Sequence, residues 1–190
     1  METEYQLKTE GSNVAGPRYV RPIQISLRLL SLFTTLAATI VMALSKETSI
    51  IPLVLSPLLP PIQVVAPAKY HYSSAFVYFV VVNAIACGYA AVSLITGCSK
   101  KASMSQNFMA ALCIIDVIMA ALVSTGTGAA AAIGVVGMKG NSHLNWNRIC
   151  NHFGRFCSQV AAAIGVSIIG ILAFLLLALV SIAALRKRSR

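Results

Sequence analysis

Charged residues are scarce in this sequence, and acids are the scarcest. Charged side chains make up 11% of the chain, with 5 Asp and Glu against 15 Lys and Arg, whereas an ordinary soluble domain carries about 25% charge. Hydrophobic residues make up 57%, and the mean hydropathy is +0.79. This composition excludes a soluble globular enzyme, a disordered tail and a small secreted domain held by disulfides, and it predicts a membrane protein.

The net charge of +10 does not indicate a nucleic-acid partner in this setting. The basic residues lie in the tails and short loops beside apolar runs, where they act as topology signals and contact anionic lipid. The sequence has no basic stripe interleaved with aromatic residues of the kind that binds single strands. We therefore expect contact with membrane lipids and no nucleic acid.

Catalytic chemistry has few candidate residues. From residue 48 to the C-terminus Asp116 is the only acid, so no carboxylate pair is available there for acid–base work. No Gly-rich phosphate loop precedes a Lys-Ser or Lys-Thr pair. A Cys150/His152 nucleophile is conceivable, but a disulfide at Cys150 would block it. We expect no enzyme activity and no cofactor.

Four apolar segments are long enough to cross a bilayer as helices. They cover residues 23–44, 73–96, 107–132 and 160–185. We therefore expect an all-α membrane protein, a four-transmembrane-helix bundle over residues 23–185. A flexible tail (1–22) precedes it, and a basic tail (186–190) follows.

The links between the spans predict the orientation of the chain. Residues 48–71 are apolar but carry five prolines; proline removes a backbone donor, so we expect a loop lying on or beside the membrane. Most Lys and Arg residues outside the spans lie in the two tails and the link 97–106. The positive-inside rule then predicts two cytoplasmic termini and two extracellular loops, 48–71 and 134–159.

Arg28 and Asp116 are the only charged residues within the predicted spans. An unpaired charge at a span centre costs about 2.5–3.5 kcal/mol, and both residues lie in the half of their span nearest the cytoplasmic face. We expect an ion pair that fixes the register of the helices. The other interpretation is an ion or proton pathway, because ionisable groups inside membranes often mark one.

Two rows of residues predict how the paired spans pack. Arg28 heads a polar stripe on the first span that continues through Ser31, Thr35 and Thr39. Asp116 heads a row of small residues, spaced four apart, that continues through Ala120, Ser124 and Gly128. Small residues let membrane helices approach closely, so we expect the first and third spans to pack face to face. We expect Asn83, in the second span, to hydrogen-bond between helices.

The five cysteines fall into three settings. Cys87 and Cys113 lie within spans and are expected to pack as apolar side chains. Cys98 precedes two lysines at the cytoplasmic boundary and is a candidate palmitoylation site. Cys150 and Cys157 share the second extracellular loop, where the oxidising compartment favours a disulfide.

A disulfide between Cys150 and Cys157 sets a geometric condition. Residues seven apart in one helix are about 10 Å apart, whereas a disulfide needs Cα atoms within about 7 Å. The chain must therefore bend, and Gly154 is the expected place. A zinc site that adds His143 and His152 is the alternative, although the spacing matches no standard zinc finger.

Several short motifs occur in order along the chain. Arg28 in the first span and the Val81–Ile85 segment of the second are followed by Asp116 and the Ala-rich stretch 128–132. Beyond them stand the Lys139-Gly140-Asn141 step and then Trp146, Cys150, Phe153, Phe156 and Cys157. This order resembles the plant Casparian strip membrane domain proteins and their CASP-like relatives, a tetraspan family related in architecture to the MARVEL proteins of animal junctions.

The first extracellular loop departs from the Casparian strip proteins proper. Those proteins resemble one another in an acidic, Phe-rich segment behind the first span. Here Glu47, which directly precedes loop 48–71, is the only acid in this region, and no Phe lies between Phe33 and Phe76. The resemblance therefore indicates a CASP-like protein of the first subgroup, without indicating residence at a Casparian strip.

The resemblance implies a multi-pass plasma-membrane scaffold without catalytic activity. Such proteins form homo- and hetero-oligomers with related tetraspans, build membrane domains and guide enzymes that modify the local cell wall. The alternative function is a small ion or proton channel or transporter subunit that uses the Arg28/Asp116 pair.

Overall fold

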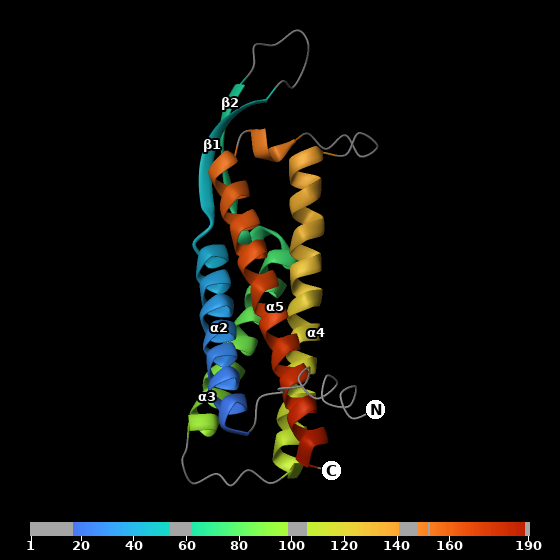
Figure 1. The fold of residues 1–190 in the computed structure, drawn as a ribbon. Coiled ribbons are helices and arrows are strands. Elements are labelled where there is room, and N and C mark those ends of the chain that lie inside the picture. Colours follow the sequence, from blue (N-terminus) through green and yellow to red (C-terminus); the bar gives the residue numbers. More distant parts are fainter. Residues whose placement is uncertain (1–16, 54–61, 99–105, 141–147, 152, 189–190) are drawn as a thin grey trace, which may run out of the picture.

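Four long helices run side by side as a bundle in the computed structural model (Figure 1). The structure describes residues 17–53, 62–98, 106–140, 148–151 and 153–188. The helices are α2 (Pro17–Ala43), α3 (Ser74–Cys98), α4 (Gln106–Lys139) and α5 (Gly154–Arg188). Each contains a segment long and apolar enough to cross a membrane, which confirms the four predicted spans.

The helices are longer than the predicted spans. α2 begins at Pro17, inside the predicted tail, and proline suits a first helical turn because its fixed φ matches and its missing N–H has no partner there. α4 and α5 have 34 and 35 residues, and α5 continues into the predicted basic tail. α4 stops where Gly140 adopts a φ of 70° and its N–H bonds to the Val136 carbonyl at 2.8 Å, the usual glycine cap.

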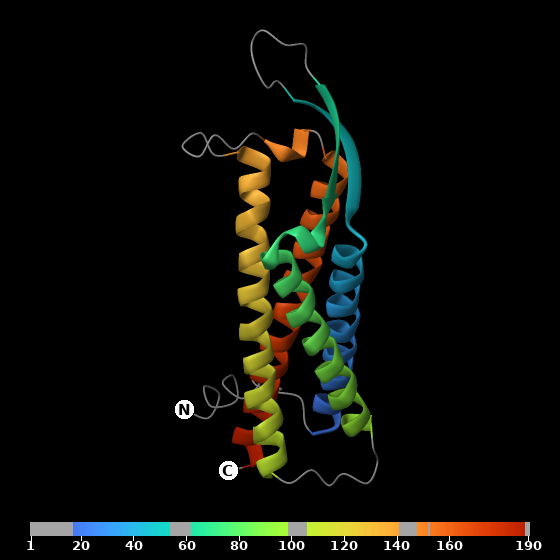
Figure 2. The ribbon, with the colours of Figure 1, turned by 180° about the vertical axis from the view of Figure 1, so that it is seen from behind.

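The order of the helices around the bundle differs from the prediction. α2 packs against α3 and α5, and α4 packs against the same two helices. α2 and α4 therefore lie diagonally opposite each other (Figures 1 and 2). The prediction that the first and third spans pack face to face is wrong, because the long Arg28 side chain reaches Asp116 across the bundle without requiring α2 and α4 to be neighbours.

The buried row of α4 also differs from the predicted one. Ala120 is buried, but Ser124 and Gly128 are exposed. The buried row runs instead through Asp116, Ala120, Val123, Thr127 and Ala130. Steps of four alone rotate by about 40° each, whereas alternating steps of four and three keep facing one direction. The predicted row therefore leaves the core after Ala120.

Residues 46–53 and 62–69 form the two strands of a β-hairpin, which the sequence did not predict. Strand β1 (Lys46–Leu53) pairs antiparallel with β2 (Ile62–Lys69), with Lys46 opposite Lys69 and Leu53 opposite Ile62. The 3₁₀ turn η1 (Tyr70–Tyr72) then leads into α3. Pro52 and Pro67 stand within the strands, which a two-stranded sheet accommodates because each strand has an unpaired edge. The expected all-α fold is thus a helical bundle with one hairpin.

The two ends of the bundle are unlike. At one end, here called the tail end, α2 begins and α5 ends. At the other, here called the hairpin end, the hairpin projects beyond α2, and the 3₁₀ turn η3 (Ile149–Asn151) lies between α4 and α5 (Figure 1). Seen from behind, α3 starts well short of the hairpin-end tip of α4 (Figure 2).

Gly170 lies where α5 packs tightly against α2, and it generates a prediction. A Cβ built there would stand 2.9 Å from Thr34 Oγ1 and 3.4 Å from Thr35 Cγ2. We expect Gly170→Leu to push the helices apart and to lower the free energy of unfolding by about 1–3 kcal/mol. The measurement is thermal unfolding of the purified protein, followed by circular dichroism. Gly165→Leu is the control, because Gly165 lies on the same helix with nothing within 4 Å of its added Cβ. Equal destabilisation by both changes would contradict the prediction.

Candidate functional site

Arg28 and Asp116 meet in the core from diagonally opposite helices. Arg28 Nη2 lies 3.3 Å from Asp116 Oδ2, and Nη1 lies 3.5 Å from Oδ1. The Asp116 side chain is fully buried, and Arg28 is 6% exposed. The two parallel contacts match the planar fork of a guanidinium to the two oxygens of a carboxylate.

Tyr89 of α3 is a third member of this cluster, and the sequence reading missed it. Its hydroxyl donates to Asp116 Oδ1 at 2.7 Å and lies 3.3 Å from the Leu112 carbonyl of α4. Its ring lies 6.3 Å from that of Phe174, on α5. A tyrosine deep inside a span, far from the interfacial belt that tyrosines usually occupy, was the available signal. All four helices therefore meet at this level.

A second polar cluster lies nearer the hairpin end. Ser167 of α5 donates to Asn83 Oδ1 at 3.1 Å and stands 3.0 Å from the hydroxyl of Thr127. Asn83 Nδ2 donates to the Phe79 carbonyl of its own helix at 2.9 Å. Asn83 and Ser167 are fully buried, and Thr127 is nearly so. This cluster joins α3, α4 and α5. Asn83 hydrogen-bonds between helices, as predicted, and its partner is Ser167.

The polar stripe of α2 is satisfied by its own helix. Ser31 donates to the Arg28 carbonyl at 3.0 Å, Thr35 to the Ser31 carbonyl and Thr39 to the Thr35 carbonyl, both at 2.7 Å. Ser31 and Thr35 are fully buried and Thr39 is half-buried. These hydroxyls are thus engaged with backbone rather than presented to a water-filled path.

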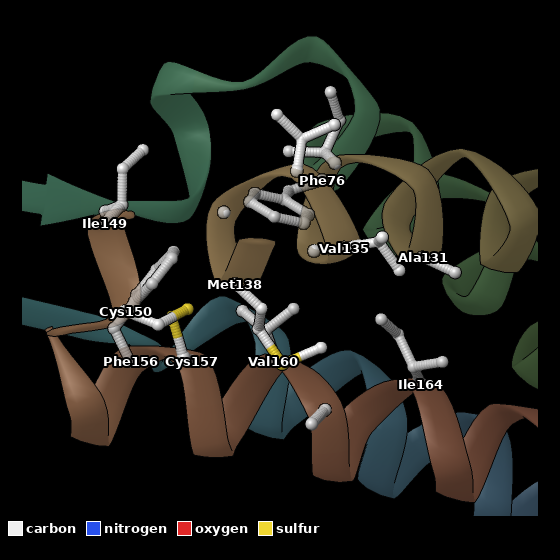
Figure 3. A pocket seen from close by; sticks show the side chains of 15 residues that line it. Phe76, Ala131, Val135, Met138, Ile149, Cys150, Phe156, Cys157, Val160 and Ile164 are labelled. Carbon is white, nitrogen blue, oxygen red and sulfur yellow. A yellow bond between two sulfur atoms is a disulfide. The ribbon is translucent and has the colours of Figure 1, made fainter. Parts of the chain in front are cut away.

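Cys150 and Cys157 form the predicted disulfide at the hairpin end, with Cα atoms 5.7 Å apart. The two cysteines lie in different helical segments, as the expected bend requires: η3 ends at Asn151, and α5 begins at Gly154, the residue at which the bend was expected. Figure 3 shows the bridge beside Phe156 and Ile149.

The structure describes some of the other cysteine and histidine residues and not others. Cys113 is buried, with Sγ 3.6 Å from the Ala178 carbonyl, and Cys87 is half-buried. Among the residues that the structure describes, no three His, Cys, Asp or Glu side chains gather as metal ligands. His143, His152 and the side chain of Cys98 lie outside the described parts, as do the zinc and palmitoylation expectations that depend on them.

Glu47 connects the hairpin to α5. Its Oε2 accepts a hydrogen bond from the Phe156 amide at 2.8 Å. Phe156 is in the first turn of α5, whose free amides and partial positive charge favour a carboxylate. Strand β1, most of which belongs to the predicted loop 48–71, is therefore attached to the predicted loop 134–159 at the level of the disulfide.

Comparison with known proteins identifies the family. The description "Casparian strip membrane protein domain" matches residues 17–173. The chain belongs to this family. The Casparian strip domain begins at the first residue of α2 and includes Arg28, Asp116 and both bridged cysteines.

Several relatives of this chain are CASP-like proteins named 1E1 or 1E2. CASP-like protein 1E1 of Glycine max is 50% identical over 163 residues, 86% of each chain, and CASP-like protein 1E2 of the same plant is 49% identical over 176 residues, 93% of this chain and 94% of the relative. CASP-like protein 1E1 of Arabidopsis thaliana is 38% identical over 183 residues, 93% of this chain and 95% of the relative. These likenesses confirm the predicted family and first subgroup. No solved structure matches the chain.

The ion pair makes a prediction about this CASP-like chain that separates charge from packing. Asp116→Asn or Arg28→Met alone leaves a buried charge without its partner, and we expect each to cost about 3 kcal/mol of stability. The double variant Arg28→Met with Asp116→Leu removes both charges and should recover most of that loss. Tyr89→Phe should cost about 1 kcal/mol, as for other hydrogen bonds between membrane helices.

The readout is thermal unfolding of the four purified variants beside the wild type. A double variant no more stable than the worse single variant would contradict the pairing as the source of the loss.

The Glu47 contact makes a separate prediction about the hairpin end. Glu47→Ala removes the acceptor of the Phe156 amide and should destabilise the first turn of α5 by about 1 kcal/mol. Glu47→Gln keeps an oxygen acceptor and should cost less. Hydrogen exchange of peptides covering residues 153–158 measures this directly, and unchanged exchange in Glu47→Ala would contradict it.

Proposed function

We propose that this CASP-like protein is a non-catalytic plasma-membrane scaffold. It self-associates into oligomers and membrane domains with related tetraspans and helps to organise local cell-wall modification. Family membership supports this function, and the closed Arg28–Asp116–Tyr89 cluster is the observation that carries it. A scaffold needs a rigid bundle that keeps its shape when neighbours bind. This cluster joins α2 and α4, which lie diagonally opposite each other.

The surroundings of the cluster favour a fixed pair over a proton or ion pathway. Both carboxylate oxygens of Asp116 accept hydrogen bonds, and the side chain is fully buried. In the described parts of the helices, from this level to Lys139 and Arg155 near the hairpin end, no further Asp, Glu, His, Lys or Arg occurs. A relay needs such groups at intervals. The role proposed for the pair is to fix helix register.

The same proposal includes the orientation of the chain. Both termini are cytoplasmic, and the hairpin and η3 are extracellular. Support comes from the tail end, where α2 begins and α5 ends (Figure 1), because the two tails and the link 97–106 together carry 9 of the 14 basic residues outside the predicted spans. Support also comes from the disulfide at the hairpin end, since disulfides persist on the oxidising side of a membrane.

The hairpin end is the proposed surface for neighbours and wall-modifying enzymes. Each hairpin strand has an edge without a strand partner, and such edges pair readily with other chains. Val65 of β2 is 63% exposed. Contacts there would place the assembly on the cell-wall side.

Particle size tests the scaffold. The purified protein, reconstituted in nanodiscs large enough for several copies, is measured by electron microscopy and, in mild detergent, by light scattering. We expect a discrete oligomer or a larger array in both. In liposomes we expect no pH- or voltage-dependent current. A monomer at all concentrations, together with a current that Asp116→Asn abolishes, would overturn the scaffold in favour of a channel.

A further inference from the structure

An apolar pocket lies at the hairpin end, away from the ion pair. It has a volume of about 300 Å³ and lies between the last turns of α4 and the first turns of α5. Phe76, at the start of α3, lines one part of the pocket, and the Cys150–Cys157 bridge lines another (Figure 3). Its lining is apolar throughout, and pockets of this character take apolar ligands rather than ordered water.

Two glycines of α4 keep the pocket open. A Cβ built on Gly134 would point at Ile164 Cδ1, 3.9 Å away, and one built on Gly137 would stand 3.9 Å from Cys150 Sγ. The first direction leads toward α5 and the second toward η3. Longer side chains at these positions would occupy it.

The pocket lies where α4 extends beyond the end of α2. At 1.5 Å per residue, α4 continues about 35 Å beyond Asp116, whereas α2 continues about 22 Å beyond Arg28 at the same level. The extra length is still apolar and exposed: Val135 is 46% exposed and Met138 is 53% exposed, and both line the pocket. A helix longer than the bilayer is accommodated by tilting, by kinking or by local thickening of the bilayer, and thickening raises the lipids that touch the longer helix.

Basic side chains surround this end of the bundle. Lys139, Arg148 and Arg155 are all exposed, and each is next in sequence to a residue that lines the pocket. The one described acid at this end is Glu47, whose carboxylate bonds to the Phe156 amide. The charge at this end is complementary to a phosphate group.

We propose that the pocket holds an acyl chain of a membrane phospholipid raised above the surrounding leaflet. The phosphate lies toward Lys139, Arg148 and Arg155, and the chain runs past the disulfide and Phe156 into the hydrocarbon near Ile164. This site is independent of self-association, because its lining comes from one chain.

Photolabelling tests the site. The full chain is placed in phosphatidylcholine nanodiscs with a small fraction of phosphatidylglycerol that carries a diazirine near the glycerol end of one acyl chain. After irradiation and digestion, mass spectrometry locates the adducts. We expect them on residues 131–138 and 157–164. A diazirine at the methyl end of the same chain should instead label residues nearer Asp116.

Pocket-filling variants decide the outcome. Gly134→Leu, and Ala161→Phe from the opposite wall, should reduce pocket adducts about tenfold, because excluding a pair of methylene groups weakens apolar binding by that factor. Gly128→Leu is the matched control: it lies on α4, is exposed, has nothing within 4 Å of its added Cβ, and should leave the adducts unchanged. Adducts that persist in both filled variants would overturn the site, as would pocket labelling by a diazirine sterol and not by the phospholipid.

Discussion

The rest of this structure depends on the burial of two opposite charges in an apolar bundle. Arg28 and Asp116 come from helices that lie diagonally opposite, so their contact occupies the centre of the bundle rather than one helix interface. A charge there without a partner costs several kcal/mol. The pairing therefore constrains α2 and α4 in depth and rotation together, and α3 and α5 must close around it with Tyr89 and Phe174.

Close backbone approach follows from that constraint. Helices that converge on a central pair need small residues where they touch, and Gly170 provides this between α5 and α2. The Asn83–Ser167–Thr127 cluster then fixes α3, α4 and α5 about two to three turns away. With two polar clusters at different depths, sliding or rotation of one helix would break hydrogen bonds at both. Hydrocarbon offers no replacement partners for the groups released.

Sequence reasoning found the features that depend on composition and on single residues. Span number follows from apolar length, and Arg28, Asp116 and the two bridged cysteines stand out because such residues are rare in this chain. Neighbour relations were not accessible, since a helix pattern shows which face is polar but not which helix it meets. Ser124 and Gly128 were misplaced for that reason. The hairpin was missed because proline signals argue against strands in general, while an edge position permits them, and the Glu47 contact depends on the hairpin.

The two ends of the bundle divide its physical roles. Toward the tail end, the buried polar side chains Arg28, Asp116 and Tyr89 bond to one another and hold the helices of that half in place. Toward the hairpin end, α4 extends past α2, and the start of α5 is fixed by the disulfide to η3 and by the contact of Glu47 with the Phe156 amide. An apolar space between two helices would collapse if either could shift freely. It persists here because the ion pair fixes α4 on the tail-end side of the pocket, while the disulfide and Glu47 fix the start of α5 at the hairpin end.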